Sequence, residues 1–278
     1  MEKNKEMNNK TPVILMRASL SEESEVLSAK KFLPVYENRT KIPPNSLVIG
    51  RYACLPFYKE LEEDLLVNES CLINSHSQHI WIADLKEWYQ DFEGITPKTY
   101  FDLRYLPENG PFVLKGQTNS KKFNWSTHMY AKDKRQAIEV HGKLSQDSLI
   151  GQQDIYIREY VPLRRLADGF NGLQVSEEYR FFILDGQVLS GGFYWSSHLD
   201  DLTTIPDPAT VLQEFMREVL KRIGSNARFV VVDIARKEDG DFIVVELNDG
   251  QMSGLSENSP DDLYSNMKKV LSFSHSSE

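Results

Sequence analysis

Three oxygen-bearing side chains interrupt two apolar runs in the segment VVVDIARKEDGDFIVVELNDG. A two-residue turn at Asp239 and Gly240 favours a type I′ hairpin. Symmetric pairing about that turn places Asp233 opposite Glu246, with Cβ atoms about 5 Å apart, and puts Asn248 on the same face as Glu246. Oxygen ligands suit Mg²⁺, which is usually shared with substrate phosphates. The alternative is a solvent-facing acidic hairpin, and a one-residue slip in the turn would separate the two carboxylates.

A second hairpin is predicted in EEYRFFILDGQVLSGGFYW, with its turn at Asp185 and Gly186. Glu178 and Arg180 alternate with aromatic residues, so both side chains point to one face of the sheet. The guanidinium of Arg180 is always charged, and its planar donors match phosphate oxygens. The other interpretation is an exposed ion pair between Arg180 and Glu178 or another carboxylate.

Lysines in two segments of the chain could hold phosphate groups. Lys115 ends the apolar run FVLK, and a lysine at a strand end beside a flexible loop can bind phosphate as a point charge. Lys121 and Lys122 follow in GQTNSKKFNW, which has one glycine and is not a Walker motif. Taken alone, each lysine also fits a solvated surface position.

The segment IREYVP ends another predicted strand. Glu159, Tyr160 and Val161 could offer backbone groups to the edge of a purine and an apolar wall to its face. A plain connector between two halves of the chain is equally compatible. The histidines match no metal-binding pattern, and we expect His76, His79, His128 and His198 to be surface residues.

Strand and helix patterns alternate from residue 11 to about residue 94, which predicts an α/β unit with a parallel sheet. The connector GITPKTY leads into an α+β region. In that region Asp207 and Gly224 are expected to begin and end one helix. The predicted strands are 12–17, 46–52, 70–75, 110–116 and 154–162, and the predicted helices are 21–32, 56–66, 78–92, 131–143, 207–225 and one beginning near 259.

Composition excludes some classes of function. The chain has 278 residues and a net charge of −9, which argues against indiscriminate binding to nucleic acid. Between Pro111 and Arg165, however, there are ten Lys and Arg but only five Asp and Glu. This local excess of positive charge is typical of a phosphate-binding cleft and also of a charged loop without a ligand. No run approaches the length of a membrane span. The polar N-terminus and the two isolated cysteines, Cys54 and Cys71, predict a cytoplasmic protein without membrane association, although the sequence is also compatible with a disulfide between these cysteines.

The order of these motifs resembles the ATP-grasp superfamily from about residue 46 to residue 272. The matching motifs are VLKG, REYVP, EYRFFILDG and VDIARKEDGDFIVVELNDG. Asp233, Glu246 and Asn248 match the Mg²⁺ ligands of that family in type and spacing. The resemblance implies an α/β start followed by α+β: a pre-ATP-grasp domain at 11–96 and two α+β subdomains, at 97–158 and 159–273, that sandwich ATP.

The resemblance also implies roles for the other residues. Lys115 would contact the phosphates, Glu159, Tyr160 and Val161 would surround adenine, and Glu178 and Arg180 would lie near the ribose and phosphates. Lys115 and Arg180 would also be catalytic. Lys122, with ELNDGQMSGL, is similar to the two-lysine clade of ATP-grasp domains that is assigned to RNA repair.

Two features depart from the family pattern. Trp88 or Tyr89 stands where many members have a lysine, and GQTNSKKFNW replaces the usual Gly-rich flap.

The function implied is a ligase that uses ATP and Mg²⁺ and activates a carboxylate as an acyl phosphate for attack by an amine or another nucleophile. The acceptor would be a small molecule, a peptide or an RNA, and the protein could be a homodimer. One alternative is an RNA-end ligase that works through AMP transfer. A second is an ATP-binding assembly factor for a translation protein, without catalysis.

Overall fold

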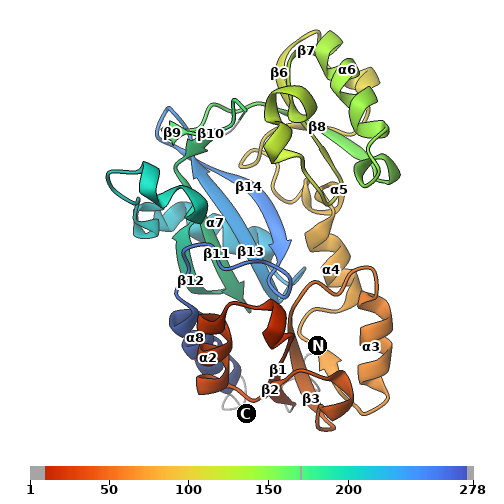
Figure 1. Cartoon of the computed structure of the whole chain (residues 1–278), viewed down its shortest axis with the longest axis vertical. Coiled ribbons are helices and arrows are strands. Elements are labelled where there is room, and N and C mark those ends of the chain that lie inside the picture. The colour runs from red at the N-terminus through yellow and green to blue at the C-terminus, as the bar shows by residue number, and fades with distance from the viewer. Residues whose placement is uncertain (1–9, 170, 274–278) are drawn as a thin grey trace.

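The computed structural model describes residues 10–169 and 171–273, and within them the strands form three four-stranded sheets and one two-stranded sheet (Figure 1). The N-terminal sheet is parallel, with the order β2-β1-β3-β4. Its strands are β1 (Thr11–Met16), β2 (Val35–Tyr36), β3 (Ser46–Arg51) and β4 (Cys71–Leu72). This confirms the predicted α/β start.

The other two four-stranded sheets are antiparallel. The middle sheet has the order β5-β8-β6-β7 and the C-terminal sheet the order β12-β11-β13-β14. The middle strands are β5 (Thr99–Tyr100), β6 (Asn109–Gly116), β7 (Tyr130–Asp133) and β8 (Ile155–Glu159). The C-terminal strands are β11 (Glu178–Leu184), β12 (Gln187–Phe193), β13 (Phe229–Arg236) and β14 (Phe242–Asp249), and the two-stranded sheet pairs β9 (Arg165–Asp168) with β10 (Gln174–Ser176).

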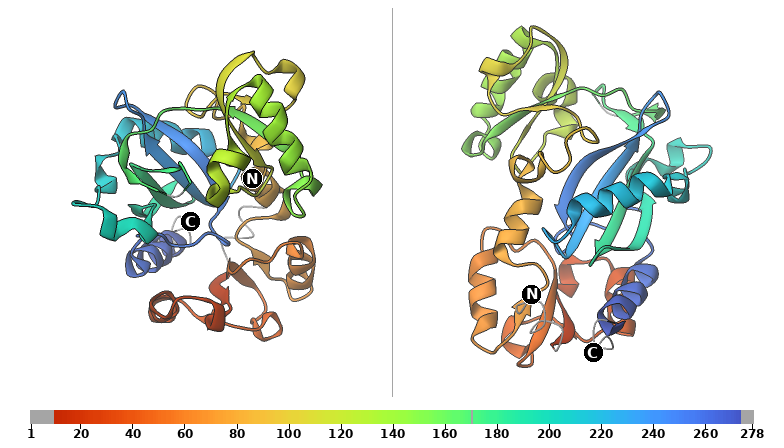
Figure 2. Two further views of the ribbon diagram at one scale, coloured as in Figure 1. Left: turned by 45° about the horizontal axis from the view of Figure 1, so that its top comes forward. Right: turned by 180° about the vertical axis from the view of Figure 1, so that it is seen from behind.

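The α-helices cover these sheets: α2 (Glu23–Phe32), α3 (Tyr58–Leu66), α4 (His76–Ala83), α5 (Leu85–Trp88), α6 (Lys134–Ser145), α7 (Gln213–Ile223) and α8 (Pro260–Phe273). Helices α2 and α8 lie side by side, and the Ser28 hydroxyl donates to Asp261 of α8 at 2.6 Å (Figure 1). The N-terminal sheet shares one hydrophobic core with the C-terminal sheet, through residues such as Ile14 and Phe229. The middle sheet has a core of its own, beneath α6. Figure 2 shows the middle sheet and α6 at the opposite end of the molecule from the parallel sheet.

Two predicted helices differ from the structure. The helix predicted over 78–92 breaks at Asp84, which has extended backbone and caps α5 by accepting the Lys86 N–H. The same carboxylate accepts hydrogen bonds from the Tyr156 hydroxyl, at 2.7 Å, and from the Gln117 amide. Capping and hydrogen bonds to the middle sheet therefore prevail over helical continuity at this residue.

The helix predicted over 207–225 begins later than expected. Asp207 caps a single 3₁₀ turn, and buried Val211 is extended before α7 starts at Gln213. Its predicted end is confirmed, because Gly224 follows Ile223 with a φ of +50°.

The hairpin of β13 and β14 has the predicted strand pairing but not the predicted turn. Lys237 N–H donates to Asp241 O and Gly240 has a φ of +97°, so the connection has three residues. That turn alone would shift the pairing by one residue. A bulge at Val245 restores the pairing, and Asp233 faces Glu246 as predicted.

Buried histidines correct another expectation. His79 and His198 are 2% and 7% exposed rather than on the surface. His79 Nδ1 lies 3.0 Å from an Asp249 carboxylate oxygen, so α4 is hydrogen-bonded to the last residue of β14. Among the described residues, no helix is long and apolar enough to cross a membrane.

Candidate functional site

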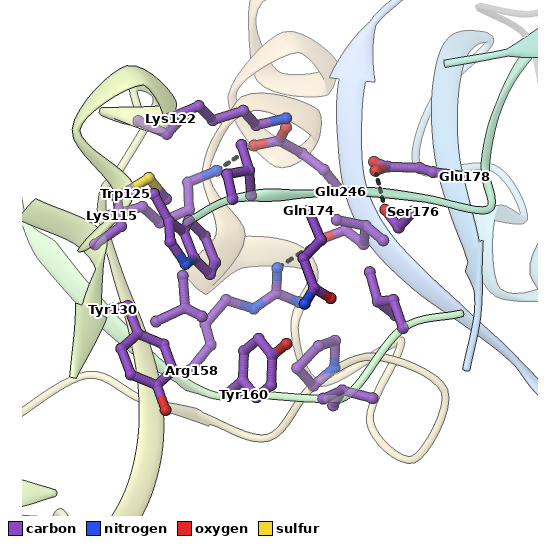
Figure 3. Close-up of a pocket in the computed structure, with 18 of the residues that line it drawn as sticks. Lys115, Lys122, Trp125, Tyr130, Arg158, Tyr160, Gln174, Ser176, Glu178 and Glu246 are labelled. Atoms are coloured by element: carbon purple, nitrogen blue, oxygen red, sulfur yellow. Dashed lines mark hydrogen bonds and ion pairs between the residues drawn. The ribbon is translucent and has the colours of Figure 1, made fainter. Parts of the chain in front are cut away.

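A cavity of about 460 Å³ lies between the middle and C-terminal sheets, with the β9–β10 hairpin along one side. Several predicted site residues line it: Lys115, Lys122, Glu159, Tyr160, Val161, Glu178 and Glu246. Figure 3 labels five of them, Lys115, Lys122, Tyr160, Glu178 and Glu246. The other three predicted site residues, Arg180, Asp233 and Asn248, lie on β11, β13 and β14 but do not contribute to its lining. They adjoin the cavity because Asp233 is the cross-strand partner of Glu246.

Arg180 holds the buried carboxylate of Asp233 with two hydrogen bonds, Nε to Oδ1 at 2.9 Å and Nη2 to Oδ2 at 2.8 Å. The Asn248 side-chain amide donates to Asp233 Oδ2 at 3.3 Å. A further Arg180 N–H donates to the Gly254 carbonyl, in the loop after β14. Burial lowers the pKa of Arg180, but Asp233 outweighs burial and leaves that pKa raised. The ion pair considered for Arg180 therefore exists, with Asp233 as its partner, and it is largely buried.

Glu246 forms an ion pair with Lys115 across the cavity. Burial by itself raises the pKa of Glu246, but Lys115, Lys122 and Arg158 outweigh burial and lower the pKa to about 2. Glu246 is therefore a carboxylate at any physiological pH. Lys115 is not a solvated surface lysine, because its side chain is only 12% exposed.

Lys122 is anchored by aromatic groups. Its ammonium donates to the Tyr194 hydroxyl at 2.7 Å and lies 4.5 Å from the Tyr194 ring centroid and 5.6 Å from that of Trp195. Burial raises the pKa of Glu178 to about 7, even though the nearby Lys122 lowers it. The cavity thus has a charged end in which Glu178 can change protonation near neutral pH.

The sequence interpretation missed Arg158, on β8. This arginine lines the cavity, is 7% exposed, and donates to the Val245 carbonyl at 2.5 Å and to Thr96 Oγ1 at 2.7 Å. Burial lowers the pKa of its guanidinium to about 10. The sequence did contain a signal for Arg158, because this residue is a charged residue within an apolar strand, as Asp233 is.

The opposite end of the cavity is apolar and aromatic. The Tyr130 and Tyr160 ring centroids lie 5.6 Å apart, and that of Trp125 lies 6.3 Å from Tyr130 (Figure 3). The backbone N–H groups of Glu159 and Tyr160 donate to other carbonyls. Val161 N–H has no such acceptor among the described residues, so it is the N–H of this segment that could serve a ligand.

The donor chemistry of Asp233, Glu246 and Asn248 fits Mg²⁺, because two facing carboxylates and an amide are hard oxygen ligands. Within the described residues, no cluster of three or more His, Cys, Asp or Glu side chains could hold a metal ion. Arg180 contacts both oxygens of Asp233, and Lys115 contacts one oxygen of Glu246. A bound Mg²⁺ would therefore share these carboxylates with two cationic side chains.

Comparisons with known proteins agree with this architecture. The family model of the ATP-grasp domain, two-lysine (R-two-K) clade, family 3, matches residues 105–267. A search of the curated proteins found no match. A RimK domain ATP-grasp protein from Sphaerobacter thermophilus DSM 20745 has a TM-score of 0.55 at 15% identity, with 92% of this chain and 99% of that chain covered.

Two further solved structures share the fold. D-alanine–D-alanine ligase from Bacillus anthracis, complexed with ATP, has a TM-score of 0.55 at 14% identity, over 97% of this chain and 99% of that chain. The ATP-grasp ligase PsnB, complexed with minimal precursor, Mg and ADP, has a TM-score of 0.58 at 11% identity, over 97% and 99%. Since the family model matches more than half of the chain, this protein belongs to the two-lysine clade, family 3, of the ATP-grasp superfamily.

Proposed function

We propose that this protein is an ATP-dependent ligase that binds Mg-ATP in the cavity and activates a carboxylate as an acyl phosphate. The observation that carries the proposal is the facing pair Asp233 and Glu246, held between Arg180 and Lys115 at the charged end of the cavity. Such an alternation of anionic and cationic side chains matches a metal-bound polyphosphate.

Each residue has a separate task in this proposal. Lys115 and Lys122 bind the phosphates. Arg180 orients Asp233 and also faces the γ-phosphoryl group that is transferred. Val161 N–H and the walls at Glu159 and Tyr160 receive adenine. These residues come from the predicted subdomains 97–158 and 159–273, and the pre-ATP-grasp domain at 11–96 would receive the acceptor.

Asp233, Glu246 and Asn248 would hold Mg²⁺, which neutralises charge on the phosphates when bound. A carboxylate oxygen of the substrate attacks the γ-phosphorus, the bond to the β-γ bridging oxygen breaks, and ADP leaves. An amine or other nucleophile then attacks the acyl carbon and inorganic phosphate departs. The chain's own contribution is positioning and fixed positive charge from its lysines and Arg180.

An RNA-end ligase would need the basic segment between Pro111 and Arg165 to bind the RNA backbone. Six of the ten cationic side chains in this segment form ion pairs with carboxylates, so they offer little free charge to an RNA backbone. This favours acyl-phosphate chemistry. The cytoplasm is the compartment we propose, because Cys54 and Cys71 are both free thiols.

Product analysis tests the proposal. Purified protein with Mg-ATP is given pooled amino acids and metabolites, a peptide mixture, or 5′-phosphorylated RNA. Release of ADP and phosphate that depends on a carboxylate acceptor supports it. Release of AMP that depends on RNA contradicts it in favour of the RNA-end ligase. Tight ATP binding with neither product contradicts it in favour of a non-catalytic assembly factor.

A further inference from the structure

A single side-chain amide, that of Gln174, belongs to the described lining of the cavity. Gln174 is an exposed residue at the start of β10, and its side chain points into the cavity toward Arg158 and Tyr160 (Figure 3). Its amide makes no hydrogen bond with the residues that the structure describes. The donor and the acceptor of this amide are therefore both available to a ligand in the cavity.

The β9–β10 hairpin fixes the direction of this side chain. Gln174 pairs with Asp168 on β9, and the alternation along β10 buries Val175 completely on the other face. At the tip, the Asn171 side chain donates to the Phe123 carbonyl, in the segment across the cavity mouth. The amide is therefore held against the cavity by the backbone on both sides of it.

The charge distribution decides which part of a nucleotide lies beside Gln174. Lys115, Lys122 and Glu246 gather at one end, and Tyr130 and Tyr160 lie at the other, with Gln174 between them and close to Tyr160 (Figure 3). Phosphates belong with the lysines, and a base belongs with the aromatic rings. Gln174 therefore lies along the edge of the base.

A side-chain amide offers one donor and one acceptor side by side. That pair matches adenine, whose N6 donates and whose N7 accepts, whereas guanine presents two acceptors, O6 and N7. A guanidinium would suit guanine, and Arg158 lies nearby. However, its Nη1 and Nη2 groups already donate to Val245 O and Thr96 Oγ1. Two of its terminal donors are thus committed, although its Nε is buried without a partner among the described residues. The amide of Gln174, by contrast, keeps a complete donor–acceptor pair for the edge of the base.

We propose that Gln174 reads N6 and N7 of adenine and is a specificity residue for ATP over GTP. This inference rests on the proposed nucleotide site. Loss of one of the two hydrogen bonds should weaken binding about tenfold. Because N7 is an atom of the ligand, its contribution can be removed without changing the protein.

The test pairs a change in the protein with a change in the ligand. Gln174→Met keeps the length of the side chain and removes the amide. Gln187→Met, at an exposed position on β12 outside the cavity, is the matched control. Affinities for ATP, 7-deaza-ATP and GTP are measured by calorimetry with Mg²⁺ present.

The wild type and Gln187→Met should bind 7-deaza-ATP and GTP about tenfold more weakly than ATP. Gln174→Met should bind ATP and 7-deaza-ATP equally. A tenfold preference for ATP that survives in Gln174→Met would overturn the inference, as would equal affinities in the wild type. Should Gln174→Met not fold, the wild-type comparison still tests the inference, because equal affinities for ATP and 7-deaza-ATP would overturn it. A wild type that binds none of the three nucleotides would instead overturn the proposed site itself.

Discussion

Arg180 and Asp233, on adjacent strands, form a two-point ion pair that is largely buried. The pair lies at one end of the cavity, beside the cross-strand contact of Asp233 with Glu246. Its position links the stability of the C-terminal sheet to the chemistry of the site. Replacement of either member therefore has to be judged by stability as well as by activity.

Arg180→Met should destabilise the protein by about 3–5 kcal/mol, because it leaves the buried carboxylate of Asp233 without its cation. Chemical denaturation measures this free energy of unfolding. Arg180→Met combined with Asp233→Asn should be more stable than Arg180→Met alone, since the unpaired charge is gone. A single variant as stable as the wild type would show that the pair does not form in solution.

Lys115→Met should weaken the binding of Mg-ATP at least about tenfold, because one fixed charge near the phosphates is lost. Calorimetry gives the affinity directly. Lys132→Met removes the same charge from an exposed position on β7 and serves as the control. Equal losses in the two variants would mean that Lys115 acts only through the general charge of the protein.

Glu178 should make stability depend on pH near neutrality. Because its pKa is raised from 4.5 to about 7 by burial, the folded protein holds this proton over a range in which the unfolded chain releases it. Its contribution is full below pH 4.5 and is lost as the pH rises toward 7, by about 3 kcal/mol at most.

Glu178→Gln, which stays neutral, tests this directly. The stability of the variant relative to the wild type should increase between pH 5 and pH 8, as measured by denaturation at each pH. A difference that stays constant over this range would contradict the raised pKa.

The predicted contact between Asp233 and Glu246 was right although the predicted turn was wrong. The apolar faces of β13 and β14 constrain the register more strongly than the turn does, and the Val245 bulge absorbs the extra residue of the turn. Bulges carry no clear sequence signal. The same bulge directs the Val245 carbonyl to Arg158, which sequence reasoning did not identify.

Long-range contacts account for the other differences. Asp84 breaks a helix because its carboxylate also binds Tyr156, 72 positions away in the chain. His79 is buried because it meets Asp249, 170 positions away. Local patterns contain neither partner, whereas the order of strands, lysines and acidic hairpins was sufficient to predict the fold class and the family.

The proposed magnesium site is tested by Glu246→Gln, through affinities measured by calorimetry with Mg-ATP and with ATP in the presence of EDTA. We expect opposite changes: Mg-ATP should bind at least about tenfold more weakly, because a metal ligand is lost, while metal-free ATP should bind no more weakly, because a negative charge near its phosphates is gone. Glu214→Gln, at an exposed position on α7, should change neither affinity. Unchanged binding of Mg-ATP by Glu246→Gln would contradict a magnesium site at this pair of carboxylates.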